Sequence, residues 1–348
     1  MTLAEGLIEL LESDELTSSL MKYSYYGISS RRTARGVTRD MLHEEARRLI
    51  EIAAASGAPR LADVPLQTAR EMAAASVGAM DLPPAEVARA DDILVPADQG
   101  GIRARLYVPT YHRTDAVFLF FHGGGWVVGN IESHDPLART IANALGMRLL
   151  SVDYRLAPEH RFPAAFDDAM AVAVWASSSP APLGAPVSAL VLGGDSAGGN
   201  LAAALSAHWS GSVKLLAQLL LYPVTDASAR SESYELFGEG HLLEARDMAF
   251  FIDHYTGAGA DRADPRLSPL YGPVDGAPPT VIATAGADVL RDEGRAYAAR
   301  LVQAGVEVHY LEATGFLHGW ATARQMLPSV TPLLNRALAS VVAIINRP

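Results

Sequence analysis

The 348-residue sequence contains no cysteine and has fewer basic than acidic residues. The absence of cysteine excludes a disulfide scaffold, a cysteine-based zinc or iron–sulfur site and a thiol nucleophile. Lysine and arginine together number 28 against 39 aspartate and glutamate residues, which gives a formal net charge of −11. Nucleic-acid binding depends on clustered basic side chains, so we expect no nucleic-acid partner.

Long apolar runs and a leader-like N-terminus are absent as well. The N-terminal segment carries Glu5, Glu9, Glu12 and Asp14, where a signal peptide would be basic and then apolar. No uninterrupted apolar run reaches the roughly 18 residues that a membrane-spanning helix needs. We therefore expect a soluble protein of the cytoplasm with no membrane partner.

Residues 1 to about 90 are rich in alanine and have apolar residues at helical spacing. We expect one helix around residues 7–11, a second over residues 41–50 and a third over Leu66–Met80. Pro83 and Pro84 then break the pattern. This part of the chain predicts a helical unit that precedes a different kind of structure.

From about residue 91 the pattern changes to short runs typical of strands. Residues 93–95 and Ile102–Val108, separated by two glycines, favour an antiparallel hairpin. Continuous apolar runs follow, each with a turn and a helical stretch after it: residues 116–121, 148–152, 189–192, 216–221, 280–285 and 306–311. This alternation indicates a mainly parallel sheet with helices on each side. Residues 227–276 interrupt it, which predicts an excursion over the C-terminal sheet edge, where ligands bind in such folds.

The pentapeptide Gly194-Asp195-Ser196-Ala197-Gly198 is a G-x-S-x-G pattern that occurs once. It lies between an expected strand and a helix-compatible stretch, which is the setting of a nucleophile elbow. In such an elbow the chain turns sharply and exposes the serine hydroxyl at the tip of the sheet, with small residues on both sides. The pattern therefore predicts Ser196 as a nucleophile, and a Gly-rich turn with a solvated serine is the alternative.

A second glycine motif, His122-Gly123-Gly124-Gly125-Trp126, follows the expected strand 116–121. Acyl transfer builds negative charge on the former carbonyl oxygen, and backbone N–H groups of consecutive glycines can be aimed at that charge. We expect Gly123, Gly124 and Gly125 to line an oxyanion hole, which the N–H of Ala197 completes. A phosphate-binding loop is the alternative, but the motif does not complete G-x-G-x-x-G and no Walker lysine follows.

A serine nucleophile needs a base, and that base needs an orienting acid. His318 follows the last expected strand, so it lies at the same sheet edge as Ser196. Asp288 and Asp226 each follow an expected parallel strand and reach the same edge. The spacing alone leaves the choice between these two carboxylates open.

Four segments together resemble the bacterial hormone-sensitive-lipase-like esterases of family IV, in the subgroup with G-D-S-A-G: residues 122–126, 151–160 (SVDYRLAPEH), 194–200 (GDSAGGN) and 288–294 (DVLRDEG). The resemblance extends from about Asp91 to the C-terminus. It implies an α/β-hydrolase fold, with an eight-stranded, mostly parallel sheet, helices on both faces and a helical cap. It also implies Ser196 as nucleophile, Asp288 as acid and His318 as base, which decides against Asp226.

The resemblance divides the chain into an N-terminal helical cap region, residues 1–90, and a catalytic domain, residues 91–348. Residues 227–276 are expected to contribute to the cap. About the first 40 residues form an extension that the family pattern does not cover. The family's H-G-F after the base is His318-Gly319-Trp320 in this sequence, which keeps an aromatic residue but changes its size. A polar cluster at Asp153, Arg155, Glu159 and His160 predicts a buried hydrogen-bonding brace.

We therefore expect a serine carboxylesterase that hydrolyses short- to medium-chain acyl esters through an acyl-enzyme, with no metal or organic cofactor. The sequence has no long exposed apolar lid, which favours soluble esters over triglycerides. Hydrolysis of an amide, carbamate or lactone is an alternative that the same groups allow. A non-catalytic small-molecule receptor on the same fold is a third reading, against which His318 speaks. Related enzymes often pair through the last strand and helix, so residues 306–311 and 341–345 make a homodimer plausible.

Overall fold

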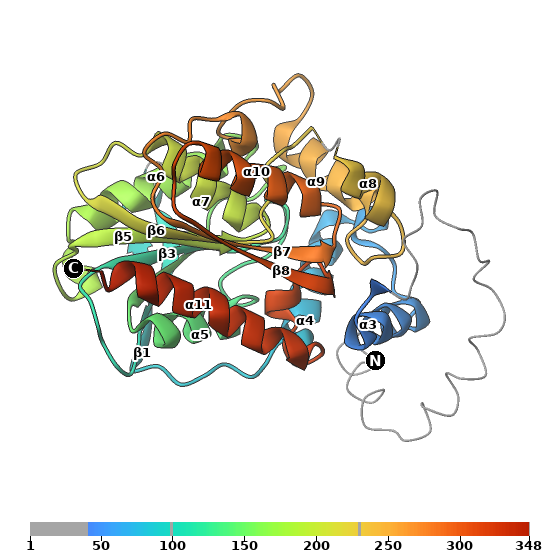
Figure 1. The fold of residues 1–348 in the computed structure, drawn as a ribbon, viewed down its shortest axis with the longest axis horizontal. Coiled ribbons are helices and arrows are strands. Elements are labelled where there is room, and N and C mark those ends of the chain that lie inside the picture. Colours follow the sequence, from blue (N-terminus) through green and yellow to red (C-terminus); the bar gives the residue numbers. More distant parts are fainter. Residues whose placement is uncertain (1–40, 98–99, 229–230, 348) are drawn as a thin grey trace.

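The computed structural model describes residues 41–97, 100–228 and 231–347 (Figure 1). The helix expected around residues 7–11 and the rest of the N-terminal extension lie outside the described residues. Within the described part, the chain forms one eight-stranded sheet in the order β1-β2-β4-β3-β5-β6-β7-β8. The strands are β1 (Arg89–Val95), β2 (Ile102–Val108), β3 (Val117–Phe121), β4 (Arg148–Val152), β5 (Ala189–Asp195), β6 (Lys214–Leu221), β7 (Thr280–Ala287) and β8 (Val308–Leu317).

The sheet is mostly parallel, as the alternation of apolar runs and helices predicts. β1 and β2 form the expected antiparallel hairpin, β2 is also antiparallel to β4, and all other neighbours are parallel. The residues of β3, β4 and β5 are all buried, because helices cover both faces of these central strands. The register pairs Phe121 of β3 with Gly194 of β5, so the chain segments that follow these two strands emerge side by side.

Helices cover both faces of the sheet (Figure 1). One face carries α5 (Asp135–Leu145) and α11 (Thr331–Ile345), and the other carries α6 (Ala164–Ser177), α7 (Ala197–His208) and α10 (Arg291–Gln303). Short 3₁₀ helices connect these elements at Leu61–Asp63, Ala181–Leu183, Pro269–Tyr271, Trp320–Thr322 and Pro328–Val330. The expectation of an α/β-hydrolase sheet with helices on both faces is confirmed.

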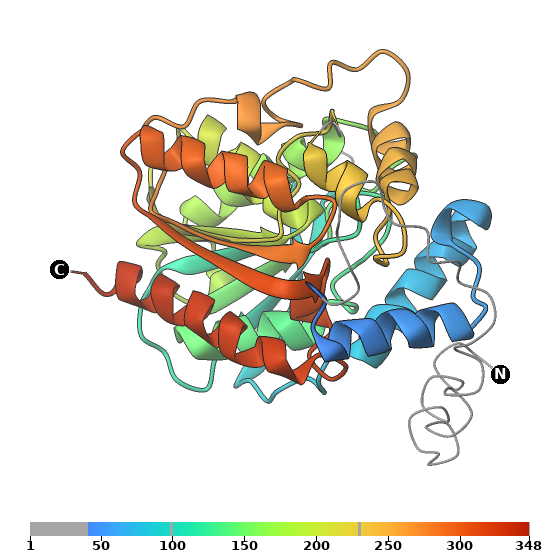
Figure 2. The same cartoon turned by 45° about the vertical axis from the view of Figure 1, so that its right-hand side comes forward.

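Four further helices gather at the end of the sheet toward which β7 and β8 point (Figures 1 and 2). They are α3 (Glu44–Ala55), α4 (Leu66–Met80), α8 (Glu232–Phe237) and α9 (Ala245–Thr256). The start of α3 is joined to β8, because the N–H of His43 donates to the carbonyl of Gly315 at 2.9 Å. The end of α4 is anchored by a buried ion pair between Asp81 and Arg324, whose Nη2 lies 2.7 Å from Oδ2 of the aspartate.

The C-terminal helix α11 is strongly apolar. By length and composition, residues 328–345 pass as a membrane-spanning helix, which was not expected from the sequence. In this fold α11 contacts α5 and the strands β6, β7 and β8. Its buried side chains, Leu334, Ala337, Leu338, Val341 and Ile344, cover the sheet. Packing on the sheet thus accounts for the buried third of residues 328–345.

Candidate active site

Ser196 occupies the sharp turn between β5 and α7. Its backbone angles, φ 54° and ψ −118°, belong to a region that residues with a side chain rarely adopt. The turn requires glycine at both ends, because a Cβ on Gly194 or Gly198 would collide with the carbonyl oxygen of Phe121 on β3. The N–H of Ser196 donates to the carbonyl of Leu221 on β6 at 2.8 Å, which fixes the turn between neighbouring strands. This is the geometry of the predicted nucleophile elbow.

His318 connects the serine to a carboxylate. Its Nε2 lies 2.9 Å from Oγ of Ser196, and its Nδ1 lies 2.8 Å from Oδ2 of Asp288. When Nδ1 donates its proton to this carboxylate, Nε2 is free to accept the proton of the serine hydroxyl. The ring of Tyr222 meets the imidazole edge-on at a centroid distance of 4.8 Å and limits its rotation.

The two candidate acids have different surroundings. Asp288 is 1% exposed, and its Oδ1 accepts a hydrogen bond from the N–H of Leu290 at 2.9 Å. Asp226 instead accepts hydrogen bonds from the hydroxyl of Tyr271 at 2.9 Å and the N–H of Ser228 at 2.8 Å. The structure therefore brings Asp288, and not Asp226, to the imidazole.

The loop after β3 carries the three glycines beside the serine. Gly124 and Gly125 both have left-handed φ values, 116° and 58°. In the described residues, no acceptor binds the backbone N–H of Gly124, Gly125 or Ala197. These are the groups that an oxyanion could use.

Gly123 differs from its two neighbours, because its N–H is already donated to Oδ1 of Asp195 at 2.9 Å. Asp195 is buried, and Nε2 of His134 lies 3.3 Å from the same carboxylate oxygen. Burial alone would raise the pKa of Asp195, but the facing imidazole of His134 and the N–H of Gly123 hold this pKa below its ordinary value. The N–H of Gly123 therefore already has an acceptor within the protein, unlike the N–H groups of Gly124 and Gly125.

His122 begins the same loop and is fully buried. Its ring stacks on Tyr154 at a centroid distance of 4.3 Å, and the hydroxyl of Tyr154 donates to the carbonyl of His122 at 2.7 Å. Burial, together with the nearby imidazole of His134, lowers the pKa of His122 to about 3. A neutral His122 thus belongs to the support of the loop. Sequence patterns gave no role to Asp195 or His134, although Asp195 stands inside the elbow pentapeptide.

The polar cluster after β4 is only partly the brace that the sequence predicts. Arg155 does form one, with a 2.7 Å ion pair to Asp168, which is 3% exposed. Glu159 and His160 are exposed, and Glu159 pairs with Arg70 on α4. The expectation of a single buried brace is wrong, because these side chains point to partners on different elements.

Helix α9 covers the glycine loop. The ring of Phe251 lies against Gly125, where any Cβ would collide with it. Tyr255 stacks on Trp126 at a centroid distance of 4.5 Å and an interplanar angle of 11°. Residue 126 has a left-handed φ of 61°, so this stacking holds an unfavourable backbone turn in place. Among residues 41–97, 100–228 and 231–347, no group of His, Asp and Glu side chains could hold a metal ion.

Residues 118–322 match a family model described as the alpha/beta hydrolase fold. The chain belongs to the α/β-hydrolase fold family. Within it, the chain is 39% identical over 265 residues to the carboxylic ester hydrolase LipN of Mycobacterium tuberculosis, a match that covers 74% of this chain and 70% of LipN. It is 40% identical over 232 residues to an ethyl acetate hydrolase of Pseudomonas putida, covering 65% of this chain and 73% of that protein.

A solved structure supports the same membership. An ester hydrolase from the metagenome of Lake Arreo, in complex with a derivative of bipyridine phosphonate, matches with a TM-score of 0.83 and 36% identity. The match covers 88% of this chain and all of that one. This α/β hydrolase is thus a serine carboxylesterase, and the predictions of the hormone-sensitive-lipase-like family, of the fold and of an ester-hydrolysing enzyme are confirmed.

Proposed function

We propose that Ser196, His318 and Asp288 are the catalytic triad of this hydrolase. The observation that carries the proposal is the unbroken line of hydrogen bonds from Oγ of Ser196 through the imidazole to the buried carboxylate. Ser196 attacks the ester carbonyl while Nε2 of His318 takes the hydroxyl proton, and Asp288 stabilises the imidazolium. The imidazolium then protonates the leaving alcohol, and water activated by the same ring releases the acid from the acyl-enzyme.

The N–H groups of Gly124, Gly125 and Ala197 form the oxyanion hole in this proposal. They have no acceptor within the described part of the chain and lie beside the serine. Gly123 is not one of these donors, because its N–H is hydrogen-bonded to Asp195, the residue before the nucleophile, and so connects the loop to it. Preorganised donors of this kind each contribute about 3–4 kcal/mol to the stability of the transition state.

Ser196→Ala tests the assignment. We expect the variant to lose turnover of a short-chain nitrophenyl ester and covalent labelling by a fluorophosphonate probe, while its thermal unfolding stays close to that of the wild type. Activity near the wild-type level would exclude Ser196 as nucleophile. A wild-type protein that neither hydrolyses esters nor reacts with the probe would favour the receptor reading instead.

We propose soluble esters with short to medium acyl chains as substrates. This proposal is supported by helix α9, which covers the glycine loop: its Phe251 is only 6% exposed and lies against Gly125. Trp126, at the end of the same loop, is fully buried, so both rings are fixed by packing over the glycines. Turnover should fall along a series of nitrophenyl esters with longer acyl chains. A rate that rises steeply above the solubility limit of a long-chain ester would contradict this size limit.

We also propose that helices α3 and α4, with residues 227–276, form the cap of the catalytic domain. Their position at the carboxyl end of the parallel strands supports this (Figure 2). The enzyme is proposed to work in the cytoplasm, without nucleic-acid or membrane partners. A homodimer would pair β8, the last strand of the sheet, and α11 of two copies. Light scattering that gives the monomer mass of 36.9 kDa would exclude the dimer.

A further inference from the structure

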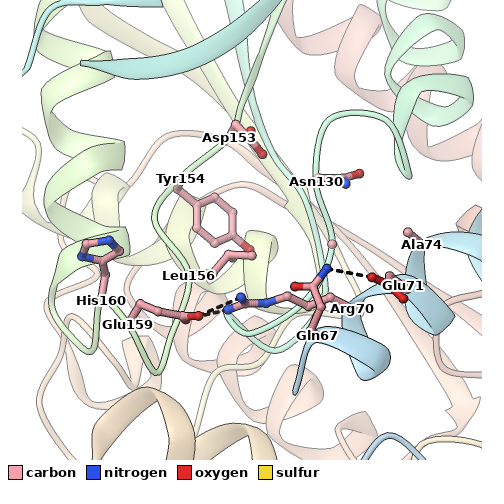
Figure 3. Close-up of a pocket in the computed structure, with 11 residues that line it drawn as sticks. Gln67, Arg70, Glu71, Ala74, Asn130, Asp153, Tyr154, Leu156, Glu159 and His160 are labelled. Atoms are coloured by element: carbon pink, nitrogen blue, oxygen red, sulfur yellow. Dashed lines mark hydrogen bonds and ion pairs between the residues drawn. The ribbon is translucent and has the colours of Figure 1, made fainter. Parts of the chain in front are cut away.

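Arg70, on the outer cap helix α4, reaches across to two loops of the catalytic domain. Its Nε donates to the carbonyl of Val127 at 2.9 Å, and its Nη2 donates to the carbonyl of Ala157 at 3.0 Å. The two outer nitrogens also bind the carboxylate of Glu159, at 2.9 and 2.7 Å. Figure 3 shows Arg70 and Glu159 extended toward each other in the wall of a cavity of about 520 Å³. One guanidinium group thus joins the cap to both loops.

Val127 belongs to the turn that follows the oxyanion glycines. The N–H groups of Val127 and Val128 both donate to the carbonyl of Gly124, at 3.1 and 2.9 Å. This carbonyl and the N–H of Gly125 belong to the same planar peptide unit, in which they point in opposite directions. Fixing the carbonyl of Gly124 therefore fixes the direction of the N–H of Gly125.

The second carbonyl that Arg70 binds, that of Ala157, belongs to a residue that contacts the same turn. The N–H of Ala157 donates to the carbonyl of Trp126 at 2.9 Å, while Nη2 of Arg70 holds the carbonyl of Ala157. Arg70 thus touches the turn directly at Val127 and indirectly through Ala157. Since Trp126 has a left-handed φ, this turn needs such outside contacts to keep its shape.

We infer that Arg70 is a positioning residue for the oxyanion hole, through which the N-terminal cap takes part in catalysis. The inference rests on the proposed role of Gly124 and Gly125. Arg70 does not touch the reacting atoms and acts through the turn at Val127. Loss of the side chain should loosen the turn without releasing the helix, because the buried Asp81–Arg324 pair still anchors the end of α4.

Arg70→Ala tests the inference, and Arg60→Ala is the matched control. Arg60 is also a cap arginine with a bidentate partner, Glu244, one of whose oxygens lies 2.9 Å from Nη2, but it has no contact with the glycine loop. A misplaced donor lowers kcat by about 10- to 100-fold, since catalysis depends on sub-ångström geometry. We therefore expect kcat for a short nitrophenyl ester to fall in that range in Arg70→Ala, with KM changed less than about twofold.

A second readout separates positioning from general destabilisation. A trifluoromethyl ketone forms a tetrahedral adduct with the serine, so its inhibition constant should rise by the same factor by which kcat falls. Arg70→Lys keeps the charge and can bind one carbonyl, so its kcat should lie between those of the wild type and Arg70→Ala. If Arg70→Ala does not fold, Arg70→Lys carries the test, with a smaller loss of kcat and of inhibitor affinity in proportion.

Three results would overturn the inference while the proposed triad stands. These are unchanged constants in the Arg70 variants, a raised KM with unchanged kcat, or equal losses in Arg60→Ala and Arg70→Ala. Failure of the proposed function looks different, because Ser196→Ala would then keep its activity. Fluorophosphonate labelling of Ser196 in the wild type, measured on the same preparations, distinguishes the two failures.

Discussion

Replacing Asp288 by asparagine tests which carboxylate orients the base. In the structure Oδ1 of Asp288 accepts from the N–H of Leu290, and Oδ2 faces Nδ1 of His318. An asparagine that keeps its oxygen on Leu290 turns its amide N–H groups toward the imidazole. Nδ1 must then accept, so the ring proton moves to Nε2, where it faces Ser196. An imidazole in this tautomer cannot take the serine proton.

The size of the expected effect follows from this tautomer. The same substitution in a Ser-His-Asp triad lowers kcat by about 10⁴-fold, which corresponds to about 5.5 kcal/mol of activation free energy. We expect a loss of that order here, because Asp288 is buried and no other described carboxylate is hydrogen-bonded to the imidazole. KM should change little, since the substrate-binding surfaces are untouched.

Asp226→Asn is the matched control, because Asp226 leaves the same edge of the sheet but binds Tyr271 and Ser228 instead. Both variants are compared in kcat for a short nitrophenyl ester, and their thermal unfolding shows whether they are folded. Asp226→Asn should retain nearly full kcat. The reasoning is refuted if Asp226→Asn loses several orders of magnitude while Asp288→Asn stays within about tenfold of the wild type.

Two buried groups predict opposite pH dependences of stability. The pKa of His122 in the folded protein, about 3, is below the ordinary histidine value of 6.5, so the unfolded chain binds the extra proton as the pH falls. Between pH 7.5 and 5 this extra protonation lowers the free energy of unfolding of the wild type by about 2 kcal/mol. In urea unfolding, His122→Gln should lose correspondingly less of its free energy of unfolding over the same pH range. Burial raises the pKa of Glu293 above its usual 4.5, against the hydrogen bonds from Thr225 and Asp226, so ionisation costs stability as the pH rises past that value. Glu293→Gln keeps an oxygen that can accept from both N–H groups. Its free energy of unfolding relative to that of the wild type should therefore increase between pH 5 and 8. If this difference in free energy is the same at both pH values, the raised pKa of Glu293 is contradicted.

The sequence predicts the positions of the strands, but not where each strand ends. The apolar runs correctly locate the parallel strands, because residues buried on both faces must be apolar. The ends of the strands are predicted less well. Strand propensity ends β5 at residue 192, but in the structure β5 continues through Gly193 and Gly194 to Asp195. The continuation comes from pairing, since Gly193 and Gly194 lie opposite Leu219 and Leu220 of β6.

The glycine loop shows a similar limit. Three consecutive glycines suggest three equal donors, but neighbouring peptide planes need not face the same way, and Gly123 is turned toward Asp195. Nothing in the local sequence marks this, because Asp195 lies 72 residues further along the chain. Arg70 gives no signal at all, since an arginine on an amphipathic helix usually faces solvent.

The sharp turn at Ser196, the glycine loop and the alternation of strands and helices follow from the sequence alone, because each depends on residues that are close along the chain. A sharp strand-to-helix turn needs small residues beside the serine, and a doubly covered sheet needs continuous apolar runs. Three features follow only from the tertiary structure: the carboxylate that His318 contacts, the hydrogen bond of Gly123 to Asp195, and the contacts of Arg70 with two loops. They depend on which side chains the strand order and helix α4 bring within hydrogen-bonding distance, and the spacing of residues along the chain does not contain that information.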